Sequence, residues 1–371
     1  MKIIFAAGGT GGHINPALAA AGEIRERYPD AEILFIGTRD KMEARLVPQA
    51  GFAFEGISMS GFQRKLTIKN IFRNIATLWR VAFSGFAVKK IIRKFSPDVV
   101  VGFGGYVSGP VVKAASGMGI KTAIHEQNAF PGVTNKLLAK NADAVMLAVE
   151  KAKEHLECKN APVVTGLPVR NEILRADRDF ARAEMGISDD MPVVFSFGGS
   201  LGAKTINDAM VDIIAEYNGK VKCHFIHGYG QYGKWMPDAL KNKGVDVENN
   251  KNLDIREYIY DMDKCLAAAD IVICRSGAST LSELQAVGKA SILIPSPNVS
   301  ENHQYHNAMT LVDASAAYVI EEKDLTHEKL SAMLNRLISD SGLRKTMGEN
   351  AKRLAIADSQ KIIADIITGL I

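Results

Sequence analysis

Cysteine is scarce in this chain, and long apolar runs are absent. The four cysteines are scattered without a C-x-x-C pair, so neither a zinc site nor a disulfide framework is indicated. No uninterrupted apolar run approaches the roughly 18 to 20 residues that cross a bilayer. The chain opens on an apolar strand and a glycine loop instead of a signal-peptide cleavage region. We therefore expect a protein of a reducing cytoplasm that neither spans a membrane nor is exported.

A signature nucleotide-binding motif is also missing. The sequence contains no G-x-x-x-x-G-K-[ST], which excludes a P-loop nucleotidase. Asp-x-Asp occurs at Asp177–Asp179 and at Asp261–Asp263, but neither pair lies in a glycine-rich segment that could hold a diphosphate. A nucleotide diphosphate would then have to be held by helix N-termini and by cations such as Arg170 instead of Mg²⁺. We therefore expect no required metal or cofactor, with at most stimulation by divalent cations.

Acidic residues are absent between Glu55 and Asp98, although the chain as a whole carries a net charge of only +4. This interval contains nine basic residues: Arg64, Lys65, Lys69, Arg73, Arg80, Lys89, Lys90, Arg93 and Lys94. Apolar side chains such as Phe62, Trp79 and Phe86 lie between them. The mixture suits an anionic membrane surface. The alternative is two ordinary helices whose basic side faces water.

Glycine, by contrast, is arranged in two similar patterns, each directly after a short apolar strand. Lys2–Ala7 runs into Gly8–His13, and Pro192–Phe197 runs into Gly198–Ala203. Both patterns then continue as a helix. Glycines permit a tight turn and close approach of backbone N–H groups, and a helix N-terminus favours negative charge. Each pattern therefore predicts a phosphate-binding turn.

Short apolar runs alternate with helical patterns along the whole chain, which predicts parallel sheets covered by helices on both faces. The remaining runs are Glu32–Ile36, Val99–Gly102, Thr122–Ile124, Ala144–Met146, Cys223–Ile226, Ile271–Ile273 and Ser291–Ile294. With 371 residues, the chain is long enough for two domains. We predict two doubly wound α/β domains facing one cleft, with the boundary near Gly166 and Pro168.

The first glycine loop does not match the dinucleotide-binding motif, and it leads into His13. Dinucleotide binding is disfavoured because the glycine spacing differs from G-x-G-x-x-G and Asp40 comes too late for a ribose contact. His13 begins the following helix, where the positive helix end disfavours the imidazolium. This position suits a neutral base or hydrogen-bonding group. The alternative is that His13 only caps the turn.

Two polar segments follow later strands of the first half. Gly102–Pro110 is another glycine-rich loop, and His125–Asn128 is a polar cluster directly behind an apolar run. Ligands bind at strand carboxyl ends in open α/β sheets, so we expect these side chains to line the cleft. The alternative is a buried polar network that fixes the loop.

In the second half, Cys274–Glu283 follows a strand. Its backbone N–H groups could hold a phosphate, and the Glu283 carboxylate could accept two hydrogen bonds from a ribose diol. Thr280–Glu283 also matches a capping box, in which Glu283 would bond the cap N–H. Farther on, Glu301, His303 and His306 suggest a metal, but their spacing matches no strong zinc pattern.

Taken together, these motifs resemble the MurG family of bacterial cell-wall glycosyltransferases over nearly the full chain. The matching segments, in family order, are Gly8–His13 with Pro16, Gly104–Pro110, His125–Asn128, Pro168–Arg170, Gly198–Ala203, Arg275–Ala278 and Asn302–Gln304. Leu167 and Glu301 stand where Asn and Asp are common, which affects local detail only.

The resemblance implies a GT-B fold and inverting transfer of N-acetylglucosamine from UDP-N-acetylglucosamine to the C4 hydroxyl of lipid I, giving lipid II. It implies an N-terminal acceptor domain over 1–166, a donor domain over 167–346 and a last segment, about 347–371, that packs back on the first domain. The implied partners are UDP-N-acetylglucosamine, lipid I, the anionic inner membrane surface on its cytoplasmic face and other cell-wall synthesis proteins, with no nucleic acid.

The resemblance also assigns site residues. The donor contacts would be Ser200 for the diphosphate, Ile259 for the uracil, Ala278, Ser279, Thr280, Leu281 and Ser282 for the phosphates and sugar, Glu283 for the ribose, and Gln304 for the N-acetylglucosamine. Further donor contacts would come from Thr10, Gly11, Gly12, Asn128 and Arg170. His13, Tyr106 and Glu126 match acceptor-side or catalytic positions, and we favour His13 as the general base because it begins a helix.

Two other readings remain open. A UDP-N-acetylglucosamine 2-epimerase or another glycolipid glycosyltransferase shares the expected fold, but an epimerase needs no membrane acceptor, and the basic, aromatic stretch over 62–95 argues against it. A nucleic-acid-binding module could use the same stretch. That reading leaves the glycine loops unexplained, and the chain lacks a concentrated basic domain.

Overall fold

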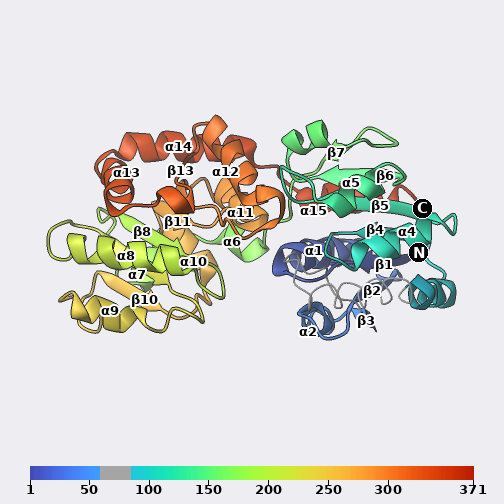
Figure 1. Cartoon of the computed structure of the whole chain (residues 1–371), viewed down its shortest axis with the longest axis horizontal. Coiled ribbons are helices and arrows are strands. Elements are labelled where there is room, and N and C mark those ends of the chain that lie inside the picture. The colour runs from blue at the N-terminus through green and yellow to red at the C-terminus, as the bar shows by residue number, and fades with distance from the viewer. Residues whose placement is uncertain (59–84) are drawn as a thin grey trace, which may run out of the picture. The chain divides into compact units, whose positions relative to one another are not determined.

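The computed structural model describes residues 1–58 and 85–371. These residues form two compact units (Figure 1). The first contains Met1–Pro168 together with Ile356–Ile371, and the second contains Val169–Ala355. Each unit is built on one sheet of parallel strands. The prediction of two doubly wound α/β domains is therefore confirmed.

The first unit contains a seven-stranded sheet with the order β3-β2-β1-β4-β5-β6-β7. Its strands are β1 (Lys2–Ala6), β2 (Glu32–Thr38), β3 (Ala53–Ile57), β4 (Val99–Gly102), β5 (Lys121–Glu126), β6 (Ala144–Leu147) and β7 (Val163–Val164). Its labelled helices are α1 (Gly11–Arg27), α2 (Glu43–Gln49), α4 (Ser108–Ser116), α5 (Val133–Ala139), the 3₁₀ helix η1 (Glu150–His155) and α15 (Ser359–Thr368). Residues 85–95 are also helical.

The second unit contains a six-stranded sheet with the order β10-β9-β8-β11-β12-β13. Its strands are β8 (Val193–Phe197), β9 (His224–Gly228), β10 (Leu253–Arg256), β11 (Ile271–Cys274), β12 (Ala290–Leu293) and β13 (Ala317–Val319). Its helices are α6 (Asn171–Arg175), α7 (Arg178–Glu184), α8 (Lys204–Tyr217), α9 (Met236–Asn242), α10 (Met262–Ala268), α11 (Ala278–Val287), η2 (Ser300–Asn302), α12 (His303–Asp313), η3 (Glu322–Asp324), α13 (His327–Ser339) and α14 (Ser341–Leu354).

The central strands are apolar along their whole length because both of their faces are buried. In β1, Ile3 and Phe5 belong to one core cluster with side chains of α1 and α15. Ile4 and Ala6 belong to a second cluster on the other face, with side chains of α4 and of residues 85–95. The second unit has the same two-sided arrangement. Continuous apolar runs, instead of alternating ones, are what such burial requires.

Three edge or outer strands were not predicted from the sequence. The side chains of β3 alternate between exposed and partly buried, and those of β10 are partly buried throughout. Strand β13 has only three residues. An edge strand has less surface to bury, so it does not need the continuous apolar run that identifies the central strands.

The predicted return of about 347–371 to the first unit is too long. Helix α14 stays in the second unit, where Met347 is 3% exposed and belongs to the core. Gly348 packs so closely that a Cβ there would lie 2.3 Å from the carbonyl oxygen of Gly288. Only the segment from Ile356 onward returns, and its helix α15 contacts α1, with an ion pair between Arg27 and Asp365.

Within the described ranges, no helix is both long enough and apolar enough to span a membrane.

Candidate active site

In each sheet the strand order runs in one direction on one side of a central strand and in the other direction on the other side. At that point the loops that follow the two neighbouring strands turn away from each other at the carboxyl edge of the sheet. In the first unit β1 lies between β2 and β4, so the loops after β1 and β4 begin side by side, with Ala6 paired to Gly102. In the second unit β8 and β11 are the corresponding neighbours, with Phe197 paired to Cys274. Ligands of doubly wound sheets bind at such points. The glycine loops predicted from the sequence lie there.

The first glycine loop holds a carboxylate of the protein itself. Glu43, at the start of α2, is fully buried. Its Oε2 accepts the Gly9 N–H at 3.1 Å, and its Oε1 accepts the Thr38 N–H at 2.8 Å. One N–H group that the sequence assigned to a phosphate is therefore already bonded. The two glycine loops are not equivalent, and Glu43 is a residue that the sequence analysis did not single out.

His13 is oriented by the same loop. Its Nδ1 lies 3.2 Å from the Gly8 carbonyl oxygen and 3.3 Å from the Thr10 hydroxyl. A carbonyl oxygen can only accept, so the first contact is a hydrogen bond in the tautomer that carries its hydrogen on Nδ1. That tautomer leaves Nε2 as the basic nitrogen. Thr10 occupies the N-cap position of α1 without a side-chain capping bond.

The loop after β4 packs directly against this arrangement. Gly104 and Gly105 have positive φ angles of 97° and 80°. A Cβ at residue 104 would lie 3.0 Å from His13 Nε2, and one at residue 105 would lie 2.2 Å from the Gly8 oxygen. Neither position accommodates a side chain. Tyr106, which follows in the same turn, is 59% exposed.

In the cluster His125–Asn128, which we expected to line the cleft, the first three side chains are buried and Asn128 is half-buried. His125, Glu126 and Gln127 are 0%, 2% and 3% exposed. His125 Nε2 lies 3.0 Å from the Gly166 carbonyl oxygen, and burial lowers the pKa of His125 to about 4. The Gln127 amide donates to the Phe103 carbonyl oxygen. The alternative reading, a polar network that fixes the loop, is the correct one for these three side chains.

Glu126 has the contacts of a loop anchor. Its Oε1 accepts both the backbone N–H and the side-chain amide of Asn128, at 2.9 and 3.1 Å. Its Oε2 accepts the Gly132 N–H and the Asn135 amide, at 3.2 and 2.8 Å. Burial raises the pKa of Glu126, and these four donors oppose that effect. Both carboxylate oxygens of Glu126 are therefore engaged by nearby donors.

In the second unit, the loop Gly198–Ala203 is supported by its neighbour. The N–H groups of Gln231 and Tyr232 donate to the carbonyl oxygens of Ser200 and Leu201, at 3.2 and 3.0 Å. Helix α8 then begins at Lys204 with no side-chain cap. Its first N–H groups have no partner within the helix, and Ser200 is exposed. This end of α8 keeps the properties of an anion site.

Glu283 does not form the capping box that the sequence allowed. Helix α11 begins at Ala278 with Gly277 as its N-cap, so Thr280 already lies inside the helix. The Glu283 carboxylate instead accepts from Arg170, with Nε and Nη2 at 3.2 and 3.0 Å from Oε1. Its side chain is 14% exposed, against 51% for Arg170. Burial raises the pKa of Glu283, and the Arg170 charge opposes this.

The first turn of α11 contains the other predicted phosphate and sugar contacts, Ala278, Ser279, Thr280, Leu281 and Ser282. The hydroxyl of Ser279 is buried and has no hydrogen-bond partner among the described residues. Leu281 is 4% exposed and belongs to the core, so its side chain supports the helix and only its backbone could meet a ligand.

Ile259 and Gln304 are both held in place by the second unit. Ile259 is 8% exposed and packs on Gly228, so only its backbone could contact a base. The flanking rings of Tyr258 and Tyr260 are exposed and lie 4.8 Å apart, a feature that the sequence analysis missed. The Gln304 side-chain oxygen accepts the Ser296 N–H at 2.8 Å, which directs its amide NH₂ group the other way.

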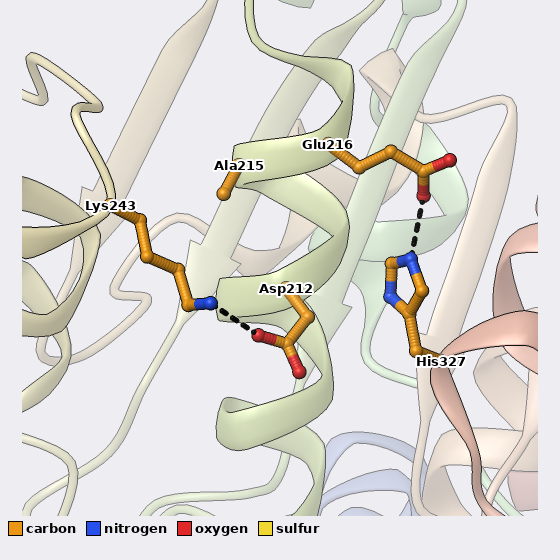
Figure 2. A pocket seen from close by; sticks show the side chains of 5 residues that line it. All are labelled: Asp212, Ala215, Glu216, Lys243 and His327. Atoms are coloured by element: carbon orange, nitrogen blue, oxygen red, sulfur yellow. Dashed lines mark ion pairs between the residues drawn. The ribbon is translucent and has the colours of Figure 1, made fainter.

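Among the described residues, no group of three or more His, Cys, Asp and Glu side chains could hold a metal ion. The second unit also contains a cavity of about 500 Å³, lined by Asp212, Ala215, Glu216, Lys243 and His327 (Figure 2). Ion pairs join Lys243 to Asp212 at 3.1 Å and His327 to Glu216 at 3.0 Å. Asp212, Ala215 and Glu216 lie toward the carboxyl end of α8, away from the glycine loop that precedes this helix. None of the predicted site residues lines this cavity.

Comparison with known proteins relates both units to one family. The model of the glycosyltransferase family 28 N-terminal domain matches residues 3–147, and that of the family 28 C-terminal domain matches residues 193–365. A UDP-N-acetylglucosamine–N-acetylmuramyl-(pentapeptide) pyrophosphoryl-undecaprenol N-acetylglucosamine transferase of Acetivibrio thermocellus is 44% identical, over 100% of this chain and 98% of its own length.

Two solved structures are also similar. The crystal structure of Acinetobacter baumannii MurG matches with a TM-score of 0.79 and 29% identity, covering 99% of each chain. A UDP-N-acetylglucosamine 2-epimerase of Neisseria meningitidis matches with a TM-score of 0.68 at 12% identity, over 100% of both chains. The second likeness concerns the fold alone.

The contacts of Glu126 predict a loss of stability on substitution. In Glu126→Gln, an NH₂ group replaces an oxygen that accepts two N–H donors, and leaving buried donors unpaired costs about 1–3 kcal/mol. We expect the free energy of unfolding in urea to fall by that amount. Glu157→Gln, which removes an exposed partner of Lys140 in the same unit, is the control and should change stability little. Equal stability of the two variants would contradict the anchoring role.

Proposed function

The chain belongs to glycosyltransferase family 28, and from this membership we propose how its residues carry out the reaction. The reaction moves N-acetylglucosamine from UDP-N-acetylglucosamine to the C4 hydroxyl of lipid I, with inversion, and yields lipid II for peptidoglycan synthesis. The observation that carries this conclusion is the 44% identity to such a transferase over the whole chain. The test is to incubate labelled donor with lipid I and to extract a labelled lipid product.

An epimerase is the weaker alternative, because its likeness is limited to the fold at 12% identity. Incubation with donor alone separates the two activities. An epimerase converts the sugar nucleotide without any lipid, whereas the transferase leaves the donor unchanged until lipid I is added.

The second unit provides the donor-binding groups. The N-termini of α8 and α11 present unpaired N–H groups and positive dipole ends, which suit a diphosphate. The carboxylate of Glu283 accepts hydrogen bonds and is oriented by Arg170, so it can receive the two hydroxyl groups of a ribose. The Gln304 amide, held by Ser296, would donate to the sugar.

Glu283→Gln is expected to weaken UDP binding and to preserve the fold. The carboxamide presents one acceptor oxygen in place of two and no charge for Arg170, and a charge-assisted hydrogen bond contributes about 1.5–3 kcal/mol. Because Glu283 caps no helix, the melting temperature should change little. Calorimetry with UDP measures the first effect. Unchanged UDP affinity together with a lower melting temperature would indicate that Glu283 only supports the structure.

We assign the general base to His13. Its Nε2 would take the proton of the acceptor hydroxyl while that oxygen attacks the anomeric carbon from the face opposite UDP. The bond from the anomeric carbon to the UDP oxygen breaks, and its electron pair leaves with the diphosphate. The helix N-termini and Arg170 would stabilise the negative charge that develops there. The attack from the opposite face accounts for inversion.

His13→Ala should lower kcat by at least about a hundredfold, since a positioned base contributes about 10² to 10⁴ in rate. The acidic limb of the pH–rate profile should disappear, because that limb reports protonation of the base. UDP affinity should remain as in the wild type. Glu126→Gln is the companion variant, compared below its melting temperature. If that variant loses the limb while His13→Ala keeps it, the base is Glu126.

The proposed reaction needs no tightly bound metal, because helix N-termini and Arg170 can oppose the diphosphate charge. Treatment with EDTA should therefore leave turnover within about twofold of the untreated enzyme. Loss of a required metal would instead remove several kcal/mol of transition-state stabilisation. Added Mg²⁺ should at most stimulate. Complete loss of turnover in EDTA, restored by Mg²⁺, would contradict this proposal.

We further propose that the first unit binds an anionic membrane surface, which would place the enzyme beside its lipid acceptor. Most of the basic stretch over 62–95, including Lys65, Lys69, Arg73 and Trp79, lies outside the described residues. Of the described part, Val88 and Ile92 are buried, while Phe86 is 77% exposed. The four basic residues Lys89, Lys90, Arg93 and Lys94 are exposed as well. A basic face with an exposed aromatic ring suits such a surface.

Replacing Lys89 and Lys90 by Ser should weaken sedimentation with anionic vesicles, since each basic residue near such a surface contributes about 1 kcal/mol. The matched control is Lys241→Ser with Lys251→Ser, which removes the same charge from exposed positions of the second unit. Equal losses in the two double variants, or binding that ignores salt, would show that residues 85–95 are ordinary helix surface. We propose that the membrane surface that the first unit binds is the cytoplasmic face of the inner membrane.

A further inference from the structure

The peptide group between Gly8 and Gly9 is hydrogen-bonded at both of its ends. Its carbonyl oxygen, on Gly8, lies 3.2 Å from His13 Nδ1, and its N–H, on Gly9, lies 3.1 Å from the Glu43 Oε2. We propose that Glu43 is a positioning residue for His13 that acts through this one peptide group. The inference rests on the proposed role of His13 as the base and adds a residue to it.

The surrounding glycines hold the carboxylate and the peptide in this position. A Cβ on Gly8 would lie 2.4 Å from the Glu43 Oε1, and a Cβ on Gly37 would lie 2.5 Å from its Cγ. The same Oε1 accepts the Thr38 N–H at 2.8 Å. Gly105 packs against the Gly8 oxygen from the other side. The peptide therefore cannot rotate away from His13 without displacing two loops.

Electrostatics then couple the carboxylate to the imidazole. A negative charge at a peptide N–H polarises the group and increases the negative charge on its carbonyl oxygen, and chains of hydrogen bonds strengthen one another. The more negative oxygen holds the hydrogen on Nδ1 and stabilises the imidazolium that forms when Nε2 takes a proton. A carboxylate bonded directly to a histidine has these effects in serine proteases. Here one peptide group lies between the two.

The other charged and titratable groups that the structure describes around Glu43 are either exposed or bonded elsewhere. Within the described part of the chain, no Lys, Arg or His side chain pairs with Glu43, which is fully buried. The charged residues that follow β2, namely Arg39, Asp40 and Lys41, are exposed and screened by water. Tyr106 on the β4 loop is largely exposed, and Glu126 after β5 is held by its own four donors.

The first measurement needs no variant. In the wild-type enzyme, ¹⁵N chemical shifts of the His13 ring should show the hydrogen on Nδ1 at a pH where the imidazole is neutral. Selective labelling of histidine and comparison with His13→Ala identify the signal. A ring that carries its hydrogen on Nε2 overturns the proposal, whatever the kinetics show.

The second measurement uses Glu43→Gln. Removing the charge destabilises the imidazolium, so protonation of the base requires a lower pH and the acidic limb of the pH–rate profile should move to lower pH. The plateau kcat should fall by about tenfold, well below the 10⁴ lost when a direct histidine partner is neutralised. UDP affinity should change little, because Glu43 itself is not among the proposed donor contacts.

The control is Asp143→Asn, since Asp143 also accepts a backbone N–H, from Thr122 at 2.9 Å, but at the amino edge of the same sheet. It should lose stability without moving the pH limb. In a His13→Ala background, Glu43→Gln should have no further effect on kcat. If His13→Ala abolishes turnover but Glu43→Gln leaves both the acidic limb and kcat unchanged, Glu43 does not position His13, although His13 remains the base. If His13→Ala retains turnover, the proposed base itself is wrong.

Discussion

The pairing of β1 with β4, and of β8 with β11, is the constraint on which the candidate site depends. Parallel strands end at the same edge of a sheet, and where the strand order reverses, the following loops turn apart. In the first unit this brings the Gly8–His13 loop against the loop of Gly104. In the second unit it makes the loops after β8 and β11 begin side by side, at Phe197 and Cys274. Without the reversal, these loops would lie on separate parts of their sheets.

Buried carboxylates are the second recurring element, and each is stabilised by a different set of donors. Glu43 accepts two backbone N–H groups, Glu126 accepts four N–H groups of its own loop, and Glu283 accepts from one arginine. A buried charge without such donors would be prohibitively costly. The differences have functional consequences. Glu126 has both oxygens occupied by nearby donors, whereas Glu283 combines partial burial with a half-exposed partner, which suits a ligand contact.

The two glycine loops show how one local motif can serve two purposes. Both follow a central strand and precede a helix, as the sequence indicated. In the second unit the loop accepts hydrogen bonds through its carbonyl groups, and the helix that follows has no side-chain cap. In the first unit the loop binds Glu43 and orients His13. The internal carboxylate at the first loop is what distinguishes the two.

The sequence by itself determined the parallel sheets, the two units and the glycine loops, because continuous apolar strands and positive-φ turns are local requirements that each segment must meet alone. It left the roles of Glu126 and Glu283 open, and it missed Glu43, the edge strand β3 and the place where the chain returns to the first unit. These features depend on contacts between distant segments: 34 residues separate Gly9 from Glu43, and 113 separate Arg170 from Glu283. Only the strand order brings such partners together, so only the tertiary structure could decide whether Thr280 and Glu283 cap a helix or whether Glu283 meets Arg170.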